Sequence, residues 1–460
     1  MLFNSYIFIF AFLPAALVLY YGLNHFGKFE AAKAALIVMS LFFYGYNNPR
    51  YALILIGSIG INYGLHYMLT QEKRAGFRKT CLVFGIVFNL GLLGYFKYLG
   101  FFAENINRLC KSSLPVLQIA LPLGISFFTF QQVSFVIDSY KRTTSRYGIL
   151  DYALFVAFFP QLIAGPIVLH SEMIPQFQDK ERKSIHYESL AAGIRYFAMG
   201  MAKKVLIADT FGKIVDAGYA DIWSLGRWAA ISVMLSYTMQ IYFDFSGYCD
   251  MAAGLGKLFH IDIPINFNSP YKAASIGEFW KRWHMTLTRF FTTYLYIPLG
   301  GNRKGRLRTY INIMIIFTVS GFWHGADWSF VLWGVLHGGA QVLYRLYIQS
   351  GLRDKLKMPR WLGVLLTFGF VNVTWVFFRA DSVGQALSLF GRMINGEGAV
   401  PWMEFAGFFL MLVVVLFTKN THERVREKAL SWKIALADIV LFTVSVFWLS
   451  QVATFLYFNF

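Results

Sequence analysis

The sequence predicts an all-α protein that crosses a membrane many times. Its composition and the spacing of its apolar runs lead to this prediction. Of the 460 residues, 57% are hydrophobic and only 14% are charged, whereas a water-soluble domain carries about 25% charged residues. Apolar stretches of about 20 residues, the length that spans the hydrocarbon core, recur along nearly the whole chain. The composition therefore excludes an ordinary water-soluble enzyme.

The apolar runs that predict membrane spans follow one another along the chain. They are 6–21, 31–44, 51–67, 80–98, 114–137, 150–169, 189–207, 227–245, 310–323, 329–348, 361–378, 401–417 and 434–456. Pro122, Pro160 and Pro166 interrupt some of them, and such segments can be re-entrant where protein buries the backbone. We expect about eleven to thirteen transmembrane or re-entrant helices in one membrane domain over residues 1–460. The first run lacks a basic n-region and a clear cleavage site, so we expect it to be retained as a span.

Basic residues predict the orientation of the chain and the molecules that it contacts. Lys and Arg number 42 against 24 Asp and Glu, which gives a formal net charge of +18. In so apolar a chain this excess indicates basic cytoplasmic loops and membrane lipid with anionic headgroups, and not nucleic acid. The loops expected on the cytoplasmic side carry basic clusters at 73–79, 141–146, 303–308, 353–360 and 419–428. The sparsely charged loops expected outside lie near 47–50, 100–113 and 379–398.

The pattern of spans changes between residues 245 and 310, where ionisable and amide side chains appear among aromatic residues. Such groups at membrane depth are costly and usually face a protein interior or a water-filled cavity, so they mark a functional path. Trp280, His284 and Leu287 have the i, i+4, i+7 spacing that predicts one helical face. The alternative is an interfacial helix whose Trp and Arg side chains anchor it at the headgroups.

A second histidine in a polar, Trp-rich window is His324, between Gly321 and Gly325. Glycines on both sides permit a close backbone approach or a break in the helix at the junction of two apolar runs. One histidine beside the end of a span is most simply a structural residue. Two such windows in the same third of the chain, around His284 and His324, favour a functional site.

Several common catalytic motifs are absent from the sequence. No P-loop, HExxH or G-x-S-x-G pattern is present. The pattern of peripheral glycerolipid acyltransferases, a histidine followed five positions later by aspartate, is also absent. Cys81, Cys110 and Cys249 form no CxxC pair, so we expect neither a metal site nor a disulfide framework. A histidine acting as general base within the membrane is the chemistry that remains.

Five windows of this sequence carry a resemblance to a known family. They lie at 121–141, 158–167, 242–271, 279–305 and 322–338, and they include the motifs RWH around His284 and FWHG around His324. With these windows in this order, the chain resembles the membrane-bound O-acyltransferases. Within them it is similar to the bacterial branch that includes the membrane subunit of alginate O-acetyltransferase. The core motifs of the resemblance span residues 121–338.

The resemblance implies a fold in which the helices surround a central reaction chamber. In that chamber His324 is essential and His284 assists. It also implies an acyl donor that comes from the cytoplasmic side, acetyl-CoA, with no covalently bound cofactor and no metal. The cations expected to bind the phosphates of coenzyme A are Lys281, Arg282 and Arg303, since Arg and Lys bind phosphate strongly.

The mechanism expected for such a site is general base catalysis, because the ordinary pKa of histidine, about 6.5, lies close to operating pH. A neutral His324 takes the proton from an attacking hydroxyl, the oxygen attacks the acetyl thioester, and the thiolate leaves. Asp327, three residues later, is expected to orient the ring of His324. The expected chamber-lining groups are Asn266, Asn268, Tyr271 and Asp244, for each of which a helix cap or a buried polar tie is an equal alternative.

The resemblance further implies the O-acetylation of an extracytoplasmic polysaccharide, carried out from the bacterial inner membrane. The acetyl group is expected to pass to an extracytoplasmic SGNH-hydrolase-like partner, whose serine then modifies the polymer. D-alanyl transfer to teichoic acid and O-acetylation of peptidoglycan remain open as alternatives. From other classes, a transporter or flippase predicts related halves with broken helices at matching positions, and no internal repeat is seen. A membrane scaffold with structural histidines is the remaining alternative.

Overall fold

The computed structural model describes residues 1–460 except 118, 352–357, 428–430, 452–455 and 457–460. Of the described residues, 78% are helical and none lies in a strand. Cα packing divides the chain into two compact units. Unit 1 comprises Met1–Met199, Tyr248–Pro264 and Leu430–Leu449, and unit 2 comprises Gly200–Gly247, Ile265–Ala429 and Ser450–Phe460. The all-α prediction is confirmed, while a single membrane domain stays a prediction.

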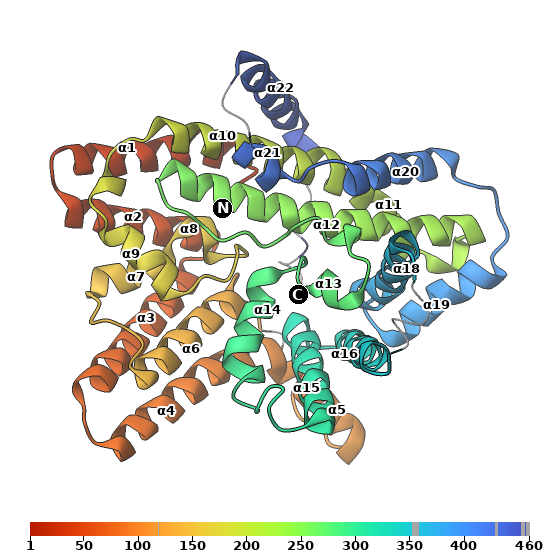
Figure 1. Ribbon diagram of the computed structural model, residues 1–460, viewed down its shortest axis with the longest axis horizontal. Coiled ribbons are helices and arrows are strands. Elements are labelled where there is room, and N and C mark those ends of the chain that lie inside the picture. Colours follow the sequence, from red (N-terminus) through yellow and green to blue (C-terminus); the bar gives the residue numbers. More distant parts are fainter. Residues whose placement is uncertain (118, 352–357, 428–430, 452–455, 457–460) are drawn as a thin grey trace. The chain divides into compact units, whose positions relative to one another are not determined.

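Unit 1 is built mainly from the N-terminal helices, coloured red to yellow in Figure 1. Here η denotes a short π-helical or 3₁₀ segment. The elements of unit 1 are η1 (Phe8–Phe12), α1 (Leu13–His25), α2 (Phe29–Gly45), α3 (Pro49–Gln71), α4 (Ala75–Leu93), η2 (Gly94–Tyr98), α5 (Leu99–Cys110), α6 (Ile125–Lys141), α7 (Ile149–Ala157), α8 (Phe159–Leu162), α9 (His170–Gln178), η3 (Glu181–Lys183), most of α10 (Tyr187–Ala202) and α22 (Trp432–Phe447). Helices α3, α4 and α6 pack against one another, as Figure 1 also shows.

A buried amide pair joins α3 to α4 inside unit 1. Asn62 donates from Nδ2 to Oδ1 of Asn89 at 3.1 Å, and Asn89 donates back to Oδ1 of Asn62 at 2.7 Å. Both side chains are fully buried. Because lipid offers no competing hydrogen bonds, such reciprocal pairs hold apolar helices together and fix their register.

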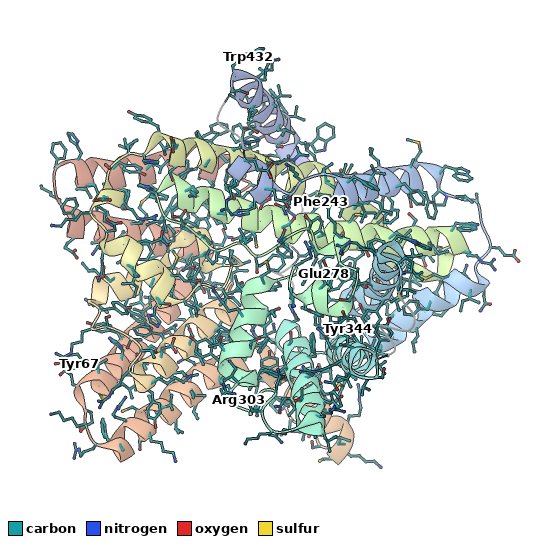
Figure 2. The ribbon with its side chains drawn as sticks, viewed as in Figure 1. Tyr67, Phe243, Glu278, Arg303, Tyr344 and Trp432 are labelled. Carbon is teal, nitrogen blue, oxygen red and sulfur yellow. The ribbon has the colours of Figure 1, made fainter. Side chains whose placement is uncertain are left out.

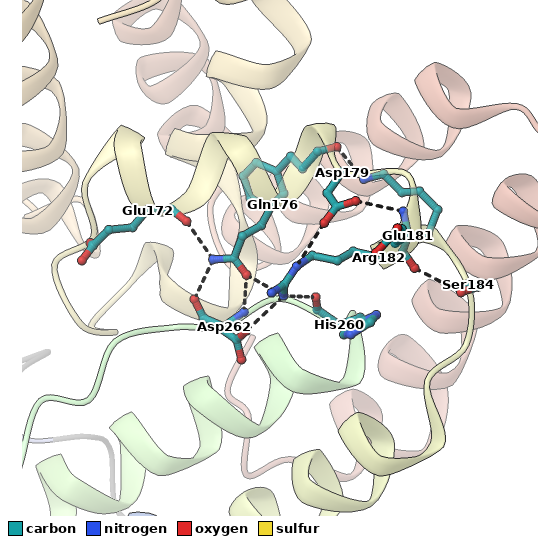
Figure 3. Close-up of polar contacts among 10 residues, drawn as sticks. Glu172, Gln176, Asp179, Glu181, Arg182, Ser184, His260 and Asp262 are labelled. Atoms are coloured by element: carbon teal, nitrogen blue, oxygen red, sulfur yellow. Dashed lines mark hydrogen bonds and ion pairs between the residues drawn. The ribbon is translucent and has the colours of Figure 1, made fainter. Parts of the chain in front are cut away.

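The loop after α9 is fixed by an ionic and amide network in unit 1, which Figure 3 shows. Arg182 contacts the Asp262 carboxylate at 3.0 Å and the His260 carbonyl at 3.0 Å. Lys257 forms a second ion pair with Asp262. Partial burial raises the pKa of Asp262, but the hydrogen bonds and charges of Lys257 and Arg182 outweigh it and leave the pKa below its usual value. The network therefore ties 179–184 to the end of the long helix α12 (Arg227–Leu258).

Unit 2 contains the two histidine windows and begins with the last three residues of α10. Its elements are η4 (Lys203–Ala208), α11 (Asp209–Ala220), η5 (Ile222–Ser224), the first part of α12, η6 (Pro270–Lys272), α13 (Ile276–Trp280), α14 (Met285–Phe291), η7 (Thr292–Tyr296), α15 (Arg306–His324), α16 (Trp328–Gln349), α18 (Arg360–Arg379), α19 (Val383–Asn395), α20 (Trp402–Phe417) and α21 (Thr421–Glu427). A last 3₁₀ segment, η8 (Trp448–Gln451), includes residues of both units.

Helices α15 and α16 form the most extensive helix pair of unit 2, and Figure 1 shows them close to each other. Gly321 and Gly334 face each other at their crossing. A Cβ on Gly321 would lie 2.3 Å from the Phe330 carbonyl oxygen, and one on Gly334 would lie 2.3 Å from that of Phe317. These glycines therefore allow the close backbone approach that the sequence predicts beside His324.

Four helical stretches among the described residues are long and apolar enough to cross a membrane, namely Phe8–His25, Pro49–Gln71, Ala75–Cys110 and Arg360–Arg379. A fifth is possible from α20 and α21 together, which meet at a bend of 46°. The other expected spans are helical but shorter, broken or more polar, and part of the last one lies outside the described residues. The breaks fall near the predicted prolines, since α6 begins three residues after Pro122 and α7 and α8 are separated before Pro160.

Candidate functional site

The backbone turns sharply at His284. Helix α13 ends at Trp280, and His284 caps α14 with φ 45° and ψ 52°, in the left-handed region. This region costs roughly 1–2 kcal/mol for a residue other than glycine, and such backbone strain clusters at functional sites. The predicted helical face of Trp280, His284 and Leu287 is therefore wrong, because a turn between two short helices replaces one continuous helix.

Asn266 contacts His284 from the segment that follows α12. The Nδ1 atom of His284 lies 3.2 Å from Oδ1 of Asn266. The same oxygen accepts the backbone N–H of Thr286 at 3.2 Å and its hydroxyl at 2.9 Å. Asn266 thus connects the histidine to the first turn of α14, and all three residues are buried.

His324 ends α15, and its ring lies beside that of His284. The two ring centroids are 6.3 Å apart. His284 is completely buried and His324 is 3% exposed. The helix ends here because Gly325 follows in an extended conformation, and the Cβ of any larger residue at 325 would clash with the Phe330 ring. The structure therefore brings together the two histidines that the sequence singles out, although 40 residues separate them.

Aromatic rings surround both imidazoles. Phe245 lies edge-on to His284 at 4.8 Å between ring centroids. Trp333 and Phe378 lie edge-on to His324 at 5.3 and 5.0 Å. A setting of this kind keeps bulk water away and strengthens electrostatic interactions.

A third histidine buried in unit 2, His337 on α16, was not singled out from the sequence. Its Nδ1 lies 3.2 Å from the donating Nε1 of Trp280, and its Nε2 lies 3.0 Å from the hydroxyl of Thr374. The signal that points to it is the run of polar residues at four-residue steps on one face of the helix: His337, Gln341, Arg345 and Gln349.

A cavity of about 820 Å³ lies in unit 2 between α13, α14, η7, α15 and α16. Trp280 contributes to its wall, and Lys281 and Arg345 supply positive charge. Glu278 and Tyr344, both labelled in Figure 2, line it from α13 and α16. Its apolar lining is Leu287, Phe291, Ile313, Ile316, Phe317 and Ile348. The size is within the range of about 300–1,000 Å³ that is usual for small-molecule sites.

The three cations expected to bind phosphate differ in their surroundings. Lys281 is exposed and lines the cavity. Arg282 instead pairs with Glu278 at 3.0 Å and donates to the Asn268 carbonyl at 3.0 Å. Burial raises the pKa of Glu278, but hydrogen bonds from Ala274 and Arg282 outweigh it, so the pKa lies below its usual value. Arg303 is exposed in the turn before α15. Of the three cations, Lys281 is the one that lines the cavity.

The contacts described for the other polar residues expected to line the chamber are with residues other than the two histidines. Asp327 caps α16 by accepting the N–H of Ser329 at 2.7 Å. Tyr271 donates to a carbonyl of α12 at 2.8 Å. Asn268 accepts from Asn420 at 3.0 Å. Asp244 pairs with Lys204 at 2.6 Å. The contacts of Asn268, Tyr271 and Asp244 are polar contacts within the fold, Asp327 is a helix cap, and Asn266 contacts a histidine. That these residues line a reaction chamber stays a prediction.

Comparison with known proteins supports the same family. A family model for the membrane-bound O-acyltransferase family matches residues 65–382. Peptidoglycan O-acetyltransferase of Helicobacter pylori is 40% identical, with all of this chain and 98% of the relative covered. Probable alginate O-acetylase AlgI of Pseudomonas aeruginosa is 35% identical, with 86% of this chain and 75% of the relative covered. Teichoic acid D-alanyltransferase of Bacillus subtilis is 27% identical over 56% of this chain and 68% of the relative.

The match to the family model covers most of the chain, and the relatives confirm the branch that the five sequence windows indicate. The apolar helices add that the protein passes through the membrane several times. The chain therefore belongs to the membrane-bound O-acyltransferase family and is a multi-pass membrane O-acyltransferase.

Proposed function

We propose that this protein moves an acetyl group from cytoplasmic acetyl-CoA across the bacterial inner membrane, for O-acetylation of a cell-envelope glycan. The observation that carries the proposal is the pair of buried histidines, His284 and His324, with ring centroids 6.3 Å apart. An acyltransferase needs a group that takes the proton of the acceptor hydroxyl, and a neutral imidazole does so near pH 7.

In the proposed reaction His324 takes the proton from the attacking hydroxyl, with His284 assisting. The hydroxyl oxygen forms a bond to the carbonyl carbon of the thioester, and the carbon–sulfur bond breaks. The proton then passes to the departing thiolate, so that the products are the ester and free coenzyme A. The aromatic surroundings of both rings support this step because they exclude competing water.

The cavity of about 820 Å³ supports a place for the donor. Lys281 and Arg345 suit the phosphates of coenzyme A, since charge-assisted contacts to phosphate are strong. The apolar side chains of the cavity suit the part of acetyl-CoA between the phosphates and the thioester, which is less polar than the phosphates. Trp280 belongs to the cavity wall and packs on Trp333, which in turn lies beside His324. Packed aromatic rings thus connect the wall of the cavity to His324, although neither histidine lines the cavity itself.

For the acceptor we favour a sugar hydroxyl of peptidoglycan. The Helicobacter pylori relative, a peptidoglycan O-acetyltransferase, matches this chain over its whole length. The alginate O-acetylase and teichoic acid D-alanyltransferase relatives match less of it. A polymer is too bulky to reach two histidines at 0% and 3% exposure. We therefore retain the SGNH-hydrolase-like partner, whose serine accepts the acetyl group and passes it to the glycan.

Reconstitution in proteoliposomes tests this function. Radiolabelled acetyl-CoA is supplied on one side, and peptidoglycan fragments are supplied on the other with and without a purified SGNH-hydrolase-like protein. We expect label to reach the glycan only when the second protein is present. Efficient labelling of the glycan by this chain alone contradicts the two-component route. Transfer from a D-alanyl thioester in preference to acetyl-CoA contradicts the acetyl assignment.

A further inference from the structure

We propose that Asn266 is a positioning residue that holds the imidazole of His284 with its proton on Nδ1 and its lone pair on Nε2. The inference rests on the proposed function, because it concerns how one of the two histidines is prepared for proton transfer. It gives Asn266 a contact to a histidine in place of the contact to substrate that the sequence suggests.

Hydrogen-bond accounting at Asn266 fixes the tautomer. The backbone N–H of Thr286 can only donate, and it lies 3.2 Å from the Asn266 side-chain atom that also lies 3.2 Å from Nδ1 of His284. That atom is therefore the carbonyl oxygen and not the amide nitrogen. A carbonyl oxygen only accepts, so Nδ1 of His284 must donate. In a neutral ring the lone pair then lies on Nε2.

The backbone keeps Asn266 and His284 in this register. The backbone N–H of Met285 donates to the backbone carbonyl of Asn266 at 3.0 Å, and the backbone N–H of Asn268 donates to the backbone carbonyl of Arg282 at 2.9 Å. Two chain segments are thus joined on either side of the side-chain contact. The left-handed backbone of His284 persists because these bonds over-determine it.

The tautomer matters for the balance of the reaction. In the proposed step one proton leaves the acceptor hydroxyl and stays on the histidine pair until the thiolate takes it. His284 helps to hold that proton only if Nε2 carries a lone pair. Among the ring contacts described for His284, the titratable group is His324 on α15, and Phe245 from α12 and Phe267 from the Asn266 segment add apolar rings.

The Asn266→Asp variant tests the proposal, because it keeps an acceptor for Nδ1 and for Thr286 and adds a negative charge. An opposite charge this close raises the pKa of an imidazole by about one to three units. An assisting His284 with a raised pKa becomes protonated at a higher pH and can then no longer help to hold the proton of the hydroxyl. We therefore expect the acidic limb of the kcat profile to move to higher pH by one unit or more. A folded variant whose acidic limb stays at the wild-type pH contradicts the positioning role.

The Asn266→Ala variant supplies a second, independent readout. It removes the acceptor, so kcat should fall at least tenfold, while the KM for acetyl-CoA stays close to wild type. The matched control is Asn372→Ala, because Asn372 is equally buried in unit 2 but accepts from Thr238 at 2.6 Å. The control should lose stability without moving the pH profile. Wild-type kcat in Asn266→Ala overturns the inference.

The His284→Ala variant distinguishes a failure of the proposed function from a failure of the role given to Asn266. Full turnover in this variant removes His284 from the reaction and contradicts that part of the proposed function. Low turnover in His284→Ala together with an unmoved acidic limb in Asn266→Asp contradicts only the role of Asn266.

Discussion

His337, His284 and His324 are all buried in the same unit, and His337 and His284 differ in what their ring nitrogens contact. Trp280 donates to Nδ1 of His337, which leaves the proton on Nε2 for Thr374. The Thr374 hydroxyl in turn donates a hydrogen bond to the Val371 carbonyl at 3.0 Å. The lone pair of His337 is therefore used within the fold, and its ring fixes Trp280 to α18.

His284 has the opposite arrangement. Its Nδ1 donates to Asn266, so its lone pair is on Nε2, and a second imidazole lies beside it. Burial and neighbouring tryptophans are common to these buried histidines, and neither feature separates a base from a structural residue. The direction of the hydrogen bonds separates them. A histidine whose lone pair accepts from a fixed donor cannot serve as a base, whereas one whose Nδ1 donates to a fixed acceptor can.

The largest expected effect follows from removing the base. His324→Ala should lower kcat by about 10²–10⁴-fold, the usual contribution of a general base. Expression and insertion should be preserved, because the ring lies among aromatic side chains that remain in place. Turnover per folded molecule, with acetyl-CoA as donor, is the measurement. Near-normal turnover would place His324 in the same structural class as His337.

A smaller effect is expected for the residues proposed to bind acetyl-CoA. Their replacement should lower the affinity for acetyl-CoA and leave kcat close to wild type. Lys281→Ala and Arg345→Ala should each weaken acetyl-CoA binding about tenfold, since a charge-assisted hydrogen bond contributes roughly 1.5–3 kcal/mol. The affinity of the wild type should fall as salt is raised, because exposed charges are screened. Arg282→Ala is the matched comparison, with a smaller loss expected because Arg282 pairs with Glu278. Titration at two salt concentrations checks this, and salt-independent binding contradicts it.

The smallest effect on turnover is expected at His337. His337→Ala leaves the Trp280 N–H without its acceptor, which costs about 1–3 kcal/mol of stability. Thermal unfolding in detergent should show this loss, while turnover per folded molecule stays far closer to wild type than in His324→Ala. A loss of turnover as large as that of His324→Ala, in a variant of normal stability, would break the comparison between the two environments.

Much of this architecture could be predicted from the sequence. Composition and the length of apolar runs predicted the all-α membrane fold, and the prolines near 122 and 160 predicted where helices break. Both histidine windows could be found because each places His and Trp in a polar stretch, and His324 also lies between two glycines at the junction of two apolar runs. Gly321 was expected to permit a close backbone approach, and it lies where α15 meets α16.

The rest depends on contacts between distant residues. Helical spacing placed Trp280 and His284 on one face, but the left-handed turn at His284 is held by Asn266, 18 residues earlier, which periodicity does not reveal. The contacts of His337 come from α13 and α18, 57 and 37 residues away. Arg282 resembles Lys281 in sequence, yet only the structure shows that Glu278 neutralises it.

The central claim is that His284 and His324 act as one unit, and a double-mutant cycle tests it most directly. The turnover of His284→Ala, His324→Ala and the double variant is measured in the same proteoliposomes with acetyl-CoA as donor. Residues that serve one step are strongly non-additive. We expect the turnover of the double variant to be within a few-fold of that of the more damaged single variant. Losses that multiply in the double variant would show that the two histidines act independently and would contradict the account.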